Sequence, residues 1–158
     1  MPDHMQGLIL KHDGYSGTAE GPAIASLDPY LDYGSLEVPE PGDGQALVKV
    51  AMASINPSDL HFIKGEYGIP RRAGVPAGFE AVGEVVKAGK GGEGLVGKRV
   101  ACFGSASGVW ADYAVADLAT CVPVMDQVPL HVGVLVGENP VTGQPLANKV
   151  VHRGRGKE

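Results

Sequence analysis

The chain has 158 residues and a mass of 16.3 kDa, which suits a single domain. Its 24 glycines and 12 prolines are about twice the usual share, but they follow no three-residue period, which excludes collagen. With 44% hydrophobic residues and a mean hydropathy of +0.02, the composition excludes an intrinsically disordered chain. The net charge of -5 argues against a nucleic-acid partner, because nucleic-acid-binding surfaces are normally basic.

No apolar run approaches the ~18 residues that a transmembrane helix needs, and the first residues lack the basic and apolar regions of a signal peptide. We therefore expect no membrane partner and a cytoplasmic location. Cys102 and Cys121 lie in separate apolar segments outside any paired motif. This placement predicts buried core thiols in a reducing compartment, and neither a disulfide framework nor a four-cysteine zinc site.

Short strand-like segments follow one another along the chain, with turn-forming residues between them. In order, these segments are residues 6–11, 35–38, 45–55, 79–87, 97–103, 109–115 and 120–124. The third begins with a two-residue alternation that places Ala46, Val48 and Val50 on one face. Gly83 interrupts the fourth, as expected at a β-bulge or a sharp bend. The pattern predicts a mainly β protein whose strongly bent sheet forms a partly closed barrel.

The character of the chain changes after Asp126. Pro129 suits the first turn of a helix, and residues 130–136 are apolar enough to pack. Beyond them, Gly143 and the basic residues near the end predict a helical or disordered C-terminal tail. No segment has the order strand, glycine-rich turn, helix, so the sequence does not predict a dinucleotide-binding βαβ unit.

Several motifs occur in a distinctive order. They are Asn56-Pro57-Ser58-Asp59 and residues 64–68 (KGEYG), 76–85 (PAGFEAVGEV), 97–100 (GKRV) and 108–114 (GVWADYA). Over about residues 6–142, the series resembles the catalytic domain of the zinc-independent medium-chain dehydrogenases/reductases, with quinone oxidoreductases and 2-enoyl thioester reductases as the nearest subgroups. The resemblance implies a GroES-like β-barrel in residues 1–127. It also implies the start of an inter-domain helix in residues 128–158, with the nucleotide-binding Rossmann domain absent.

Members of this family transfer a hydride from NADPH to an electron-poor carbon, using two domains. The resemblance therefore implies the substrate-side domain of an NADPH-dependent oxidoreductase that acts on a quinone or an activated alkene, with no turnover on its own. Relatives continue into a long helix where this chain has Gly143 and Pro145, which favours a truncated product. Two alternatives stay open: a non-catalytic barrel that binds a ligand or partner, and a fragment that associates with itself through an exposed apolar face.

The same resemblance predicts that zinc is absent. Zinc-dependent relatives have cysteine at the position of Asn56 and histidine at that of Phe79, and neither residue present here is a good zinc ligand. Asp59 and His61 form an Asp-x-His pair, but two nearby ligands do not make a site. For Glu80 we expect burial as a hydrogen-bonded carboxylate near the rim of the barrel.

Tyr67 is the candidate catalytic residue. In the enoyl reductases that the chain resembles, the tyrosine of the Gly-x-Tyr-Gly motif is linked to proton delivery after hydride attack. Hydride addition to a conjugated double bond leaves an enolate, which a nearby hydroxyl can stabilise or protonate. A phenol, with its ordinary pKa of ~10, keeps its proton at neutral pH. The alternative is that Tyr67 only caps a loop with its ring packed.

Four further residues are assigned by resemblance to the cleft for substrate and cofactor: Asn56, Asp59, Asn139 and Thr142. In quinone oxidoreductases the Asn-Pro-x-Asp segment faces the nicotinamide, and an amide suits a carboxamide or a substrate carbonyl. Alternatively, Asn56 forms an Asx turn that starts a helical segment at Pro57. Asn139 and Thr142 match a segment that relatives use near the cofactor, or they only start a helix.

Two further features have simpler interpretations. Arg71 and Arg72 could meet the phosphate of a cofactor or a thioester, although a solvated pair in a loop is the usual explanation. Residues 104–108 are rich in glycine and serine, but no lysine follows them and strand-like segments flank them. They therefore predict a hairpin turn and not a phosphate-binding loop.

Overall fold

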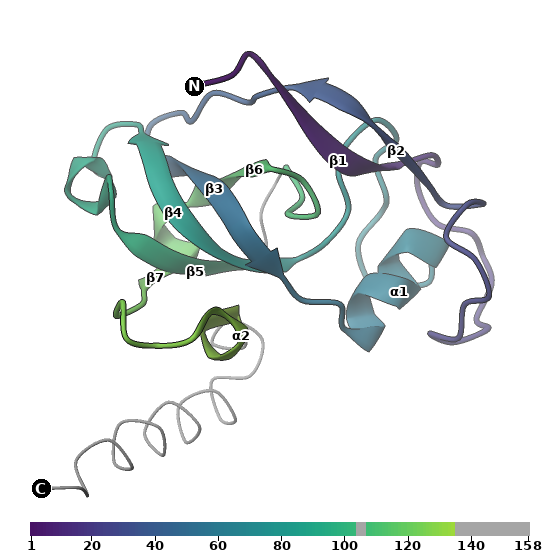
Figure 1. The fold of residues 1–158 in the computed structure, drawn as a ribbon. Coiled ribbons are helices and arrows are strands. Elements are labelled where there is room, and N and C mark those ends of the chain that lie inside the picture. The colour runs from purple at the N-terminus through teal and green to yellow at the C-terminus, as the bar shows by residue number, and fades with distance from the viewer. Residues whose placement is uncertain (104–106, 135–158) are drawn as a thin grey trace, which may run out of the picture.

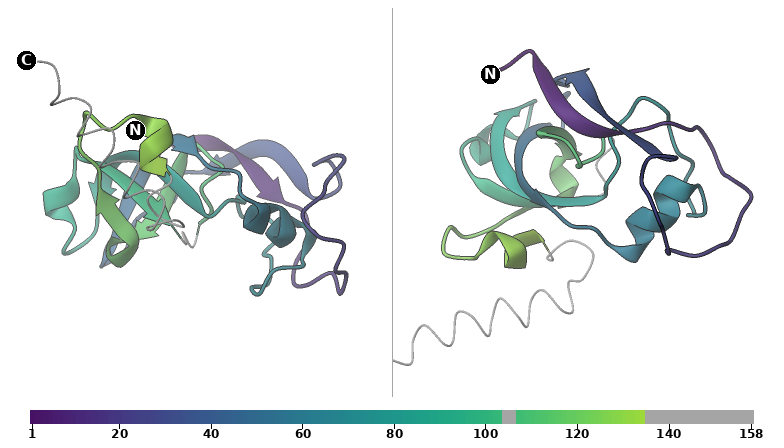
Figure 2. Two further views of the ribbon diagram at one scale, coloured as in Figure 1. Left: turned by 90° about the horizontal axis from the view of Figure 1, so that it is seen from below. Right: turned by 45° about the vertical axis from the view of Figure 1, so that its right-hand side comes forward.

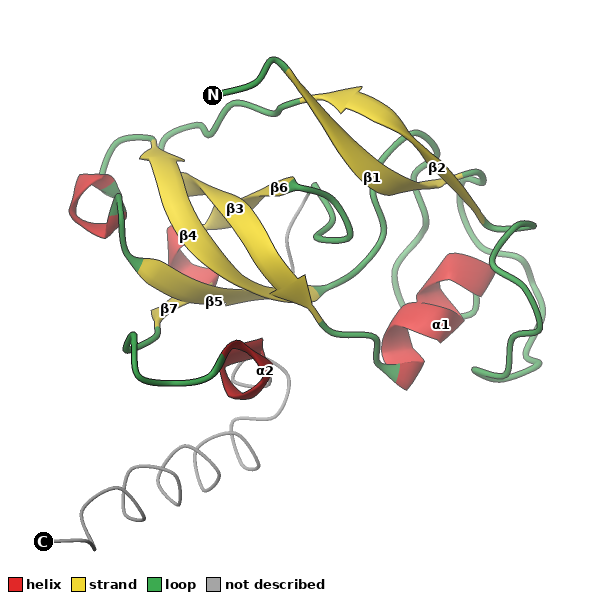
Figure 3. Cartoon of the chain, viewed as in Figure 1, coloured by secondary structure: helices red, strands yellow, loops and turns green. Residues whose placement is uncertain are grey.

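Strands dominate the computed structural model, which describes residues 1–103 and 107–134 (Figures 1 and 3). A two-stranded antiparallel sheet pairs β1 (His4–Leu10) with β2 (Leu31–Glu37). A five-stranded sheet has the order β6-β3-β4-β5-β7, with all neighbours antiparallel. Its strands are β3 (Gln45–Ala53), β4 (Glu80–Ala88), β5 (Arg99–Phe103), β6 (Tyr113–Asp117) and β7 (Cys121–Pro123). The helical elements are α1 (Pro57–Lys64), α2 (Leu130–Gly133) and the 3₁₀ turns η1 (Glu93–Leu95) and η2 (Leu118–Thr120).

The larger sheet curls because β3 and β4 approach each other closely near Gly83. A Cβ atom on Gly83 would lie 2.1 Å from the carbonyl oxygen of Lys49, so no larger residue fits without movement. The β3–β4 register slips beside it, between Val50 and Met52. The irregularity expected at Gly83 is therefore confirmed, and the sheet bends into the predicted partly closed barrel (Figure 2).

Two loops join the small sheet to the barrel. The Leu8 backbone N–H donates to the Trp110 carbonyl (2.8 Å), and the Leu8 carbonyl accepts from the Ala77 N–H (2.9 Å). The Val109 N–H also donates to Ala77 (2.9 Å). The strand predicted over residues 109–115 therefore begins only at Tyr113, because the residues before it pair with a loop and with β1.

β3 contributes to two apolar clusters, one on each of its faces. Ala46 and Val48 are fully buried in the barrel interior, and Val50 packs against the same cluster, as the alternation predicts. Leu47, on the other face, packs with Met5, Tyr113 and Val115. β3 is therefore buried on both faces near its start, over residues 46–48.

The chain stays on the barrel after β7, as far as the structure describes it. Val128, Val132 and Val134 are buried, and Gly133 approaches the side chain of Val82. The helix expected over residues 130–136 is present as α2, and the predicted tail lies outside the described residues. In residues 1–103 and 107–134, no helix is long and apolar enough to cross a membrane.

Candidate functional site

The first turn of α1 begins at Asn56, directly after β3. Pro57 occupies the first helical position, where its missing N–H costs nothing. The Asn56 N–H donates to Oδ2 of Asp59 (2.7 Å), which satisfies a donor that helix formation leaves free. At the other end, Gly65 adopts φ 80°, which ends the helix. The helical start expected at Pro57 is therefore confirmed.

Asp59 is fully buried, and its carboxylate joins two segments of the site. Oδ2 accepts from Asn56 at the helix start, and Oδ1 accepts from the Phe79 N–H (3.0 Å) just before β4. With no exposed surface, Asp59 supports Asn56 and Phe79 instead of facing solvent. Asp59 and His61 do not converge either, because Nδ1 of His61 lies 3.5 Å from Oε2 of Glu66. In the described parts of the chain, no three His, Cys, Asp or Glu side chains gather to hold a metal ion.

Asn56 belongs to a buried hydrogen-bond network at the end of β3. Its Nδ2 donates to Oγ of Ser54 (3.0 Å) and to Oε2 of Glu80 (3.3 Å), and Ser54 Oγ donates to the same carboxylate oxygen (3.2 Å). The Ser54 carbonyl accepts from Nε1 of Trp110 (2.9 Å). Glu80 is only 1% exposed, so the buried, hydrogen-bonded carboxylate predicted there is confirmed. The network fixes the orientation of the partly exposed Asn56 amide.

Tyr67 has a packed ring and is also partly exposed, so its predicted role as a proton donor stays a prediction. Its ring packs on Phe79, with centroids 5.5 Å apart, and Phe79 in turn packs on Phe62 at 4.8 Å. The residue nevertheless stays 40% exposed. Because Asp59 holds the backbone of Phe79, the three predicted residues Asn56, Asp59 and Tyr67 belong to one connected site.

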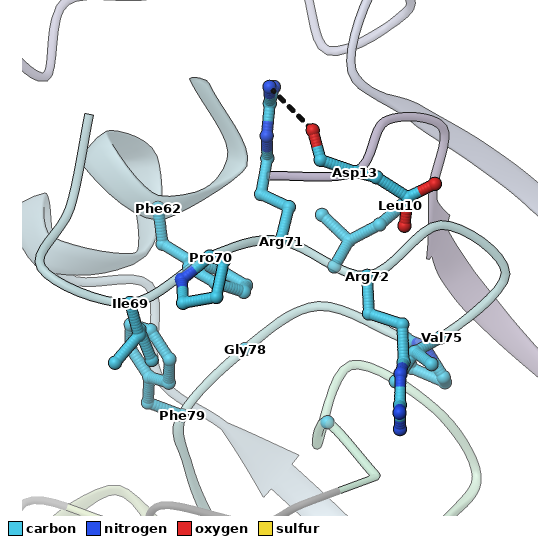
Figure 4. Close-up of a pocket in the computed structure, with 12 residues that line it drawn as sticks. Leu10, Asp13, Phe62, Ile69, Pro70, Arg71, Arg72, Val75, Gly78 and Phe79 are labelled. Atoms are coloured by element: carbon cyan, nitrogen blue, oxygen red, sulfur yellow. Dashed lines mark hydrogen bonds between the residues drawn. The ribbon is translucent and has the colours of Figure 1, made fainter. Parts of the chain in front are cut away.

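A cavity of about 500 Å³ opens beside this aromatic group (Figure 4). Phe62 and Phe79 line it together with apolar residues of β1 and of the loop before β4, including Leu10 and Val75. Gly78 and Gly108 also line it. A Cβ atom on Gly78 would lie 2.3 Å from the Trp110 ring, so glycine is needed there for the loop to lie close to the indole. Asp13, Arg71 and Arg72 line the cavity as well, so its wall is both polar and apolar, and it can receive a small molecule of mixed character.

The two arginines of the cavity wall have different environments. Arg71 is buried, and its guanidinium donates to the carbonyls of Gly14 (3.0 Å), Ile63 (3.2 Å) and Asp13 (3.5 Å), the last drawn in Figure 4. Arg72 is exposed and extends from the opposite side of the loop (Figure 4). The solvated pair expected from the sequence is thus wrong for Arg71. Within residues 1–103 and 107–134, no ion pair involves Arg72.

Behind the site, Glu66 fixes the long loop before β2, a role that sequence reasoning missed. Its carboxylate accepts from the N–H groups of Glu20 (2.9 Å) and Gly21 (3.0 Å) and from the Thr18 hydroxyl (2.8 Å). Nζ of buried Lys64 lies 3.7 Å away. The hydrogen bond from Glu20, with smaller contributions from Thr18, Gly21 and Lys64, lowers the pKa of Glu66 to about 2. The only sequence signal was a glutamate inside the Gly-x-Tyr-Gly motif, more than 40 positions from Thr18, Glu20 and Gly21 in the chain.

Asn139 and Thr142 lie outside the described residues, so their predicted place in the cleft stays a prediction. Within residues 1–103 and 107–134, no glycine-rich turn leads from a strand into a helix. The N-terminus of α1, which follows β3, is occupied by the carboxylate of Asp59. The described residues therefore lack the free helix N-terminus that commonly holds the phosphate groups of a dinucleotide, and the Asn56 amide suits its carboxamide end.

Comparisons with known proteins agree with this architecture. Residues 42–126 match the family model of the alcohol dehydrogenase GroES-like domain. A Mesorhizobium loti protein assigned as an NADPH:quinone reductase is 46% identical, with a TM-score of 0.85; the match covers 98% of this chain and 46% of that one. A mycobacterial protein solved in complex with NADPH is 25% identical, with a TM-score of 0.69, over 90% of this chain and 39% of that one.

Among curated relatives, the mitochondrial enoyl-[acyl-carrier-protein] reductase of Caenorhabditis elegans is 34% identical over 127 residues. That match covers 80% of this chain and 37% of the reductase, so the chain spans less than half of the length of these relatives. The family match includes β3 to β7 and every described residue of the connected site. The chain belongs to the GroES-like domain family of the alcohol dehydrogenases, within the medium-chain dehydrogenases/reductases.

Proposed function

We propose that this chain is the substrate-side domain of an NADPH-dependent reductase that acts on a quinone or an activated alkene such as an enoyl thioester. The observation that carries the proposal is the position of Tyr67, which is partly exposed and packed on Phe79, a residue that lines the cavity. The names of the relatives, an NADPH:quinone reductase and an enoyl reductase, support the same reaction class.

In this proposal, NADPH supplies the hydride, and residues beyond the described ones hold most of the cofactor. The barrel of residues 1–127 shapes the pocket for the acceptor, and residues 128–158 lead toward the nucleotide-binding part. The amide of Asn56, oriented by Ser54 and Glu80, faces the carboxamide or the substrate carbonyl. Asp59 is a positioning residue, because it is buried and acts through Asn56 and Phe79.

The substrate is expected to bind with its apolar body in the cavity and its reactive carbons near Tyr67. When hydride reaches the β-carbon of an enone, negative charge develops on the carbonyl oxygen. The Tyr67 hydroxyl donates a hydrogen bond to that enolate and then delivers a proton. Because the ring is held by Phe79 while the residue stays exposed, the hydroxyl can reach a ligand without a change in the fold.

The test is a chimera in which this chain, through residue 134, is continued by the remaining part of the Mesorhizobium loti protein. We expect the chimera to oxidise NADPH with 1,4-naphthoquinone or trans-2-hexenoyl-CoA, and the 158-residue chain alone to show no turnover. Effective hydride transfer needs the donor held within about 3–3.5 Å of the acceptor. We expect no turnover by the chain alone because its described residues lack a site that would bind the dinucleotide in that position. Turnover by the chain alone would contradict this division between two domains.

Tyr67→Phe in the same chimera tests the proton donor. We expect kcat for the enoyl thioester to fall by about 100-fold with little change in KM, because a general acid acts in the chemical step. Phenylalanine keeps the ring contact with Phe79, so the fold is preserved. An unchanged kcat in Tyr67→Phe would show that Tyr67 only packs its ring. If neither substrate bound to the chimera with Tyr67 in place, the result would favour a non-catalytic barrel with another ligand or partner.

A further inference from the structure

The two cysteines of the described chain face each other across neighbouring strands. Cys102 in β5 and Cys121 in β7 are register partners, although 18 residues separate them in the sequence. Both belong to the same apolar cluster, so their side chains lie on the same face of the sheet. Both are free thiols.

The hydrogen-bonding pattern of the ladder places this pair at a close position. In an antiparallel ladder, hydrogen-bonded and non-hydrogen-bonded pairs alternate. The Val124 N–H donates to the Arg99 carbonyl (2.9 Å), which marks Arg99 and Val124 as a bonded pair. The next pair, Val100 and Pro123, is therefore non-bonded, in agreement with a proline that has no N–H.

Continuing the alternation, the pair of Ala101 and Val122 is bonded and that of Cys102 and Cys121 is non-bonded. Cα atoms of non-bonded pairs lie about 4.5 Å apart, within the range of about 4.4–6.8 Å that a disulfide spans. We propose that Cys102 and Cys121 form a reversible redox-modification site, in which a low-molecular-weight disulfide such as oxidised glutathione converts the facing thiols into an intramolecular disulfide.

The exchange balances in two steps. The Cys121 thiolate attacks one sulfur of glutathione disulfide, which gives a mixed disulfide and releases one glutathione. The Cys102 thiolate then attacks the Cys121 sulfur and releases the second glutathione. The two protons lost by the cysteines are carried by the two glutathione thiols, and the protein is oxidised by two electrons.

Access to the pair runs through the edge of the sheet. β7 has three residues and no partner strand on its outer side in the described sheet, and Cys121 is 8% exposed whereas Cys102 has no exposed surface. Burial raises the pKa of Cys102 to about 12, with a further contribution from Cys121, and burial also raises the pKa of Cys121. Both groups therefore remain protonated at neutral pH, and exchange proceeds through opening of the short edge strand.

The experiment equilibrates the full 158-residue chain with mixtures of reduced and oxidised glutathione, in buffer and in concentrated urea. These equilibria give the effective concentration of one cysteine thiol toward the other. If the folded barrel accommodates the disulfide, we expect this effective concentration to be at least about tenfold higher in buffer than in urea, because folding and crosslinking then favour each other. The readouts are the loss of both thiols and an intact mass lower by two hydrogens. Starting each equilibration from both the reduced and the oxidised chain ensures that slow access is not mistaken for instability.

Mapping the bond requires cleavage at aspartate, because no lysine or arginine lies between Val100 and Lys149. Cutting before Asp112 and Asp117 leaves the two cysteines on separate peptides joined only by the disulfide. In the matched variant Cys102→Ser, we expect Cys121 to stop at the mixed disulfide with one glutathione. An effective concentration in buffer equal to or below that in urea, or disulfides only between two chains, would overturn the proposal.

Discussion

Arg71 and Arg72 are neighbours in the sequence, yet their side chains have different roles. Arg71 donates to three backbone carbonyls, so its charge is committed to holding two loops against α1. Arg72 lines the cavity, is exposed and has no ion-pair partner among the residues that the structure describes. A substrate with phosphate groups would therefore meet Arg72 at this cavity, whereas a quinone would offer it no charge.

Arg72→Gln should distinguish the two substrate classes. We expect it to weaken binding of trans-2-hexenoyl-CoA to the chain by up to about fivefold, the size of an exposed charge contact, and to leave binding of 1,4-naphthoquinone unaffected. Calorimetric titration measures both. Lys90→Gln removes an exposed cation that does not line the cavity, and it should change neither affinity. If Arg72→Gln weakened the binding of both ligands equally, the substitution would have changed the shape of the cavity instead of removing a charge contact.

The chemical type of each site residue was readable from the sequence more easily than its surroundings. Two separate motifs pointed to these residues, one to Asn56 and Asp59 and the other to Tyr67, and the fold connects them through Phe79. The burial of Asp59 was not predictable, because it depends on a hydrogen bond to a residue 20 positions later in the chain. The facing cysteines were missed for the same reason, since strand register is set by tertiary pairing.

At the scale of elements, α1 depends on one carboxylate. Asp59→Asn keeps the shape but replaces one acceptor oxygen with an NH₂ group, which then faces a backbone N–H. An unsatisfied buried donor costs about 1–3 kcal/mol, and we expect the free energy of unfolding, measured by urea denaturation, to fall by that amount. Asp28→Asn, at an exposed position, should stay within about 0.5 kcal/mol of the wild type. Equal stability of the two variants would show that Asp59 does not support the helix start.

The loop before β2 is held mainly through Glu66, which makes its attachment sensitive to acid. Because the folded-state pKa is depressed from an ordinary value near 4.5 to about 2, the folded protein favours the charged carboxylate. The resulting stability is complete above about pH 4.5 and is lost as the pH falls toward 2. Urea denaturation across this interval should show a steeper acid loss in the wild type than in Glu66→Gln.

Glu37→Gln is the matched control, because Glu37 is exposed and pairs with His4 through the backbone of the β1–β2 ladder, which the substitution leaves unchanged. Its acid response should parallel that of the wild type. The loop can be followed separately by hydrogen exchange at the N–H groups of Glu20 and Gly21, which both donate to Glu66. If their protection did not change between pH 5 and pH 3, the carboxylate would not be what holds the loop.

The barrel as a whole was predictable because its strands alternate and its turns are rich in glycine. Segment types were correct from β3 to β5, and β6 was misplaced because Val109 and Trp110 are buried without belonging to a strand. Periodicity reports burial, and it cannot say whether a buried residue pairs with a strand or with a loop. The curvature was readable only through Gly83, whose missing side chain signals a close approach.

Gly83→Ala therefore tests whether the close approach of β3 and β4 at this glycine bends the larger sheet into a barrel. Alanine at this position would place its Cβ atom 2.1 Å from the Lys49 carbonyl oxygen and 2.7 Å from a methyl group of Val48, so β3 and β4 must separate. We expect a loss of about 3 kcal/mol or more in the free energy of unfolding, with faster hydrogen exchange along both strands. Gly94→Ala is the matched control, since nothing lies within 4 Å of the added atom and its φ is not positive. If both variants unfolded at the same urea concentration, the bend of the sheet would have to come from the strand register alone.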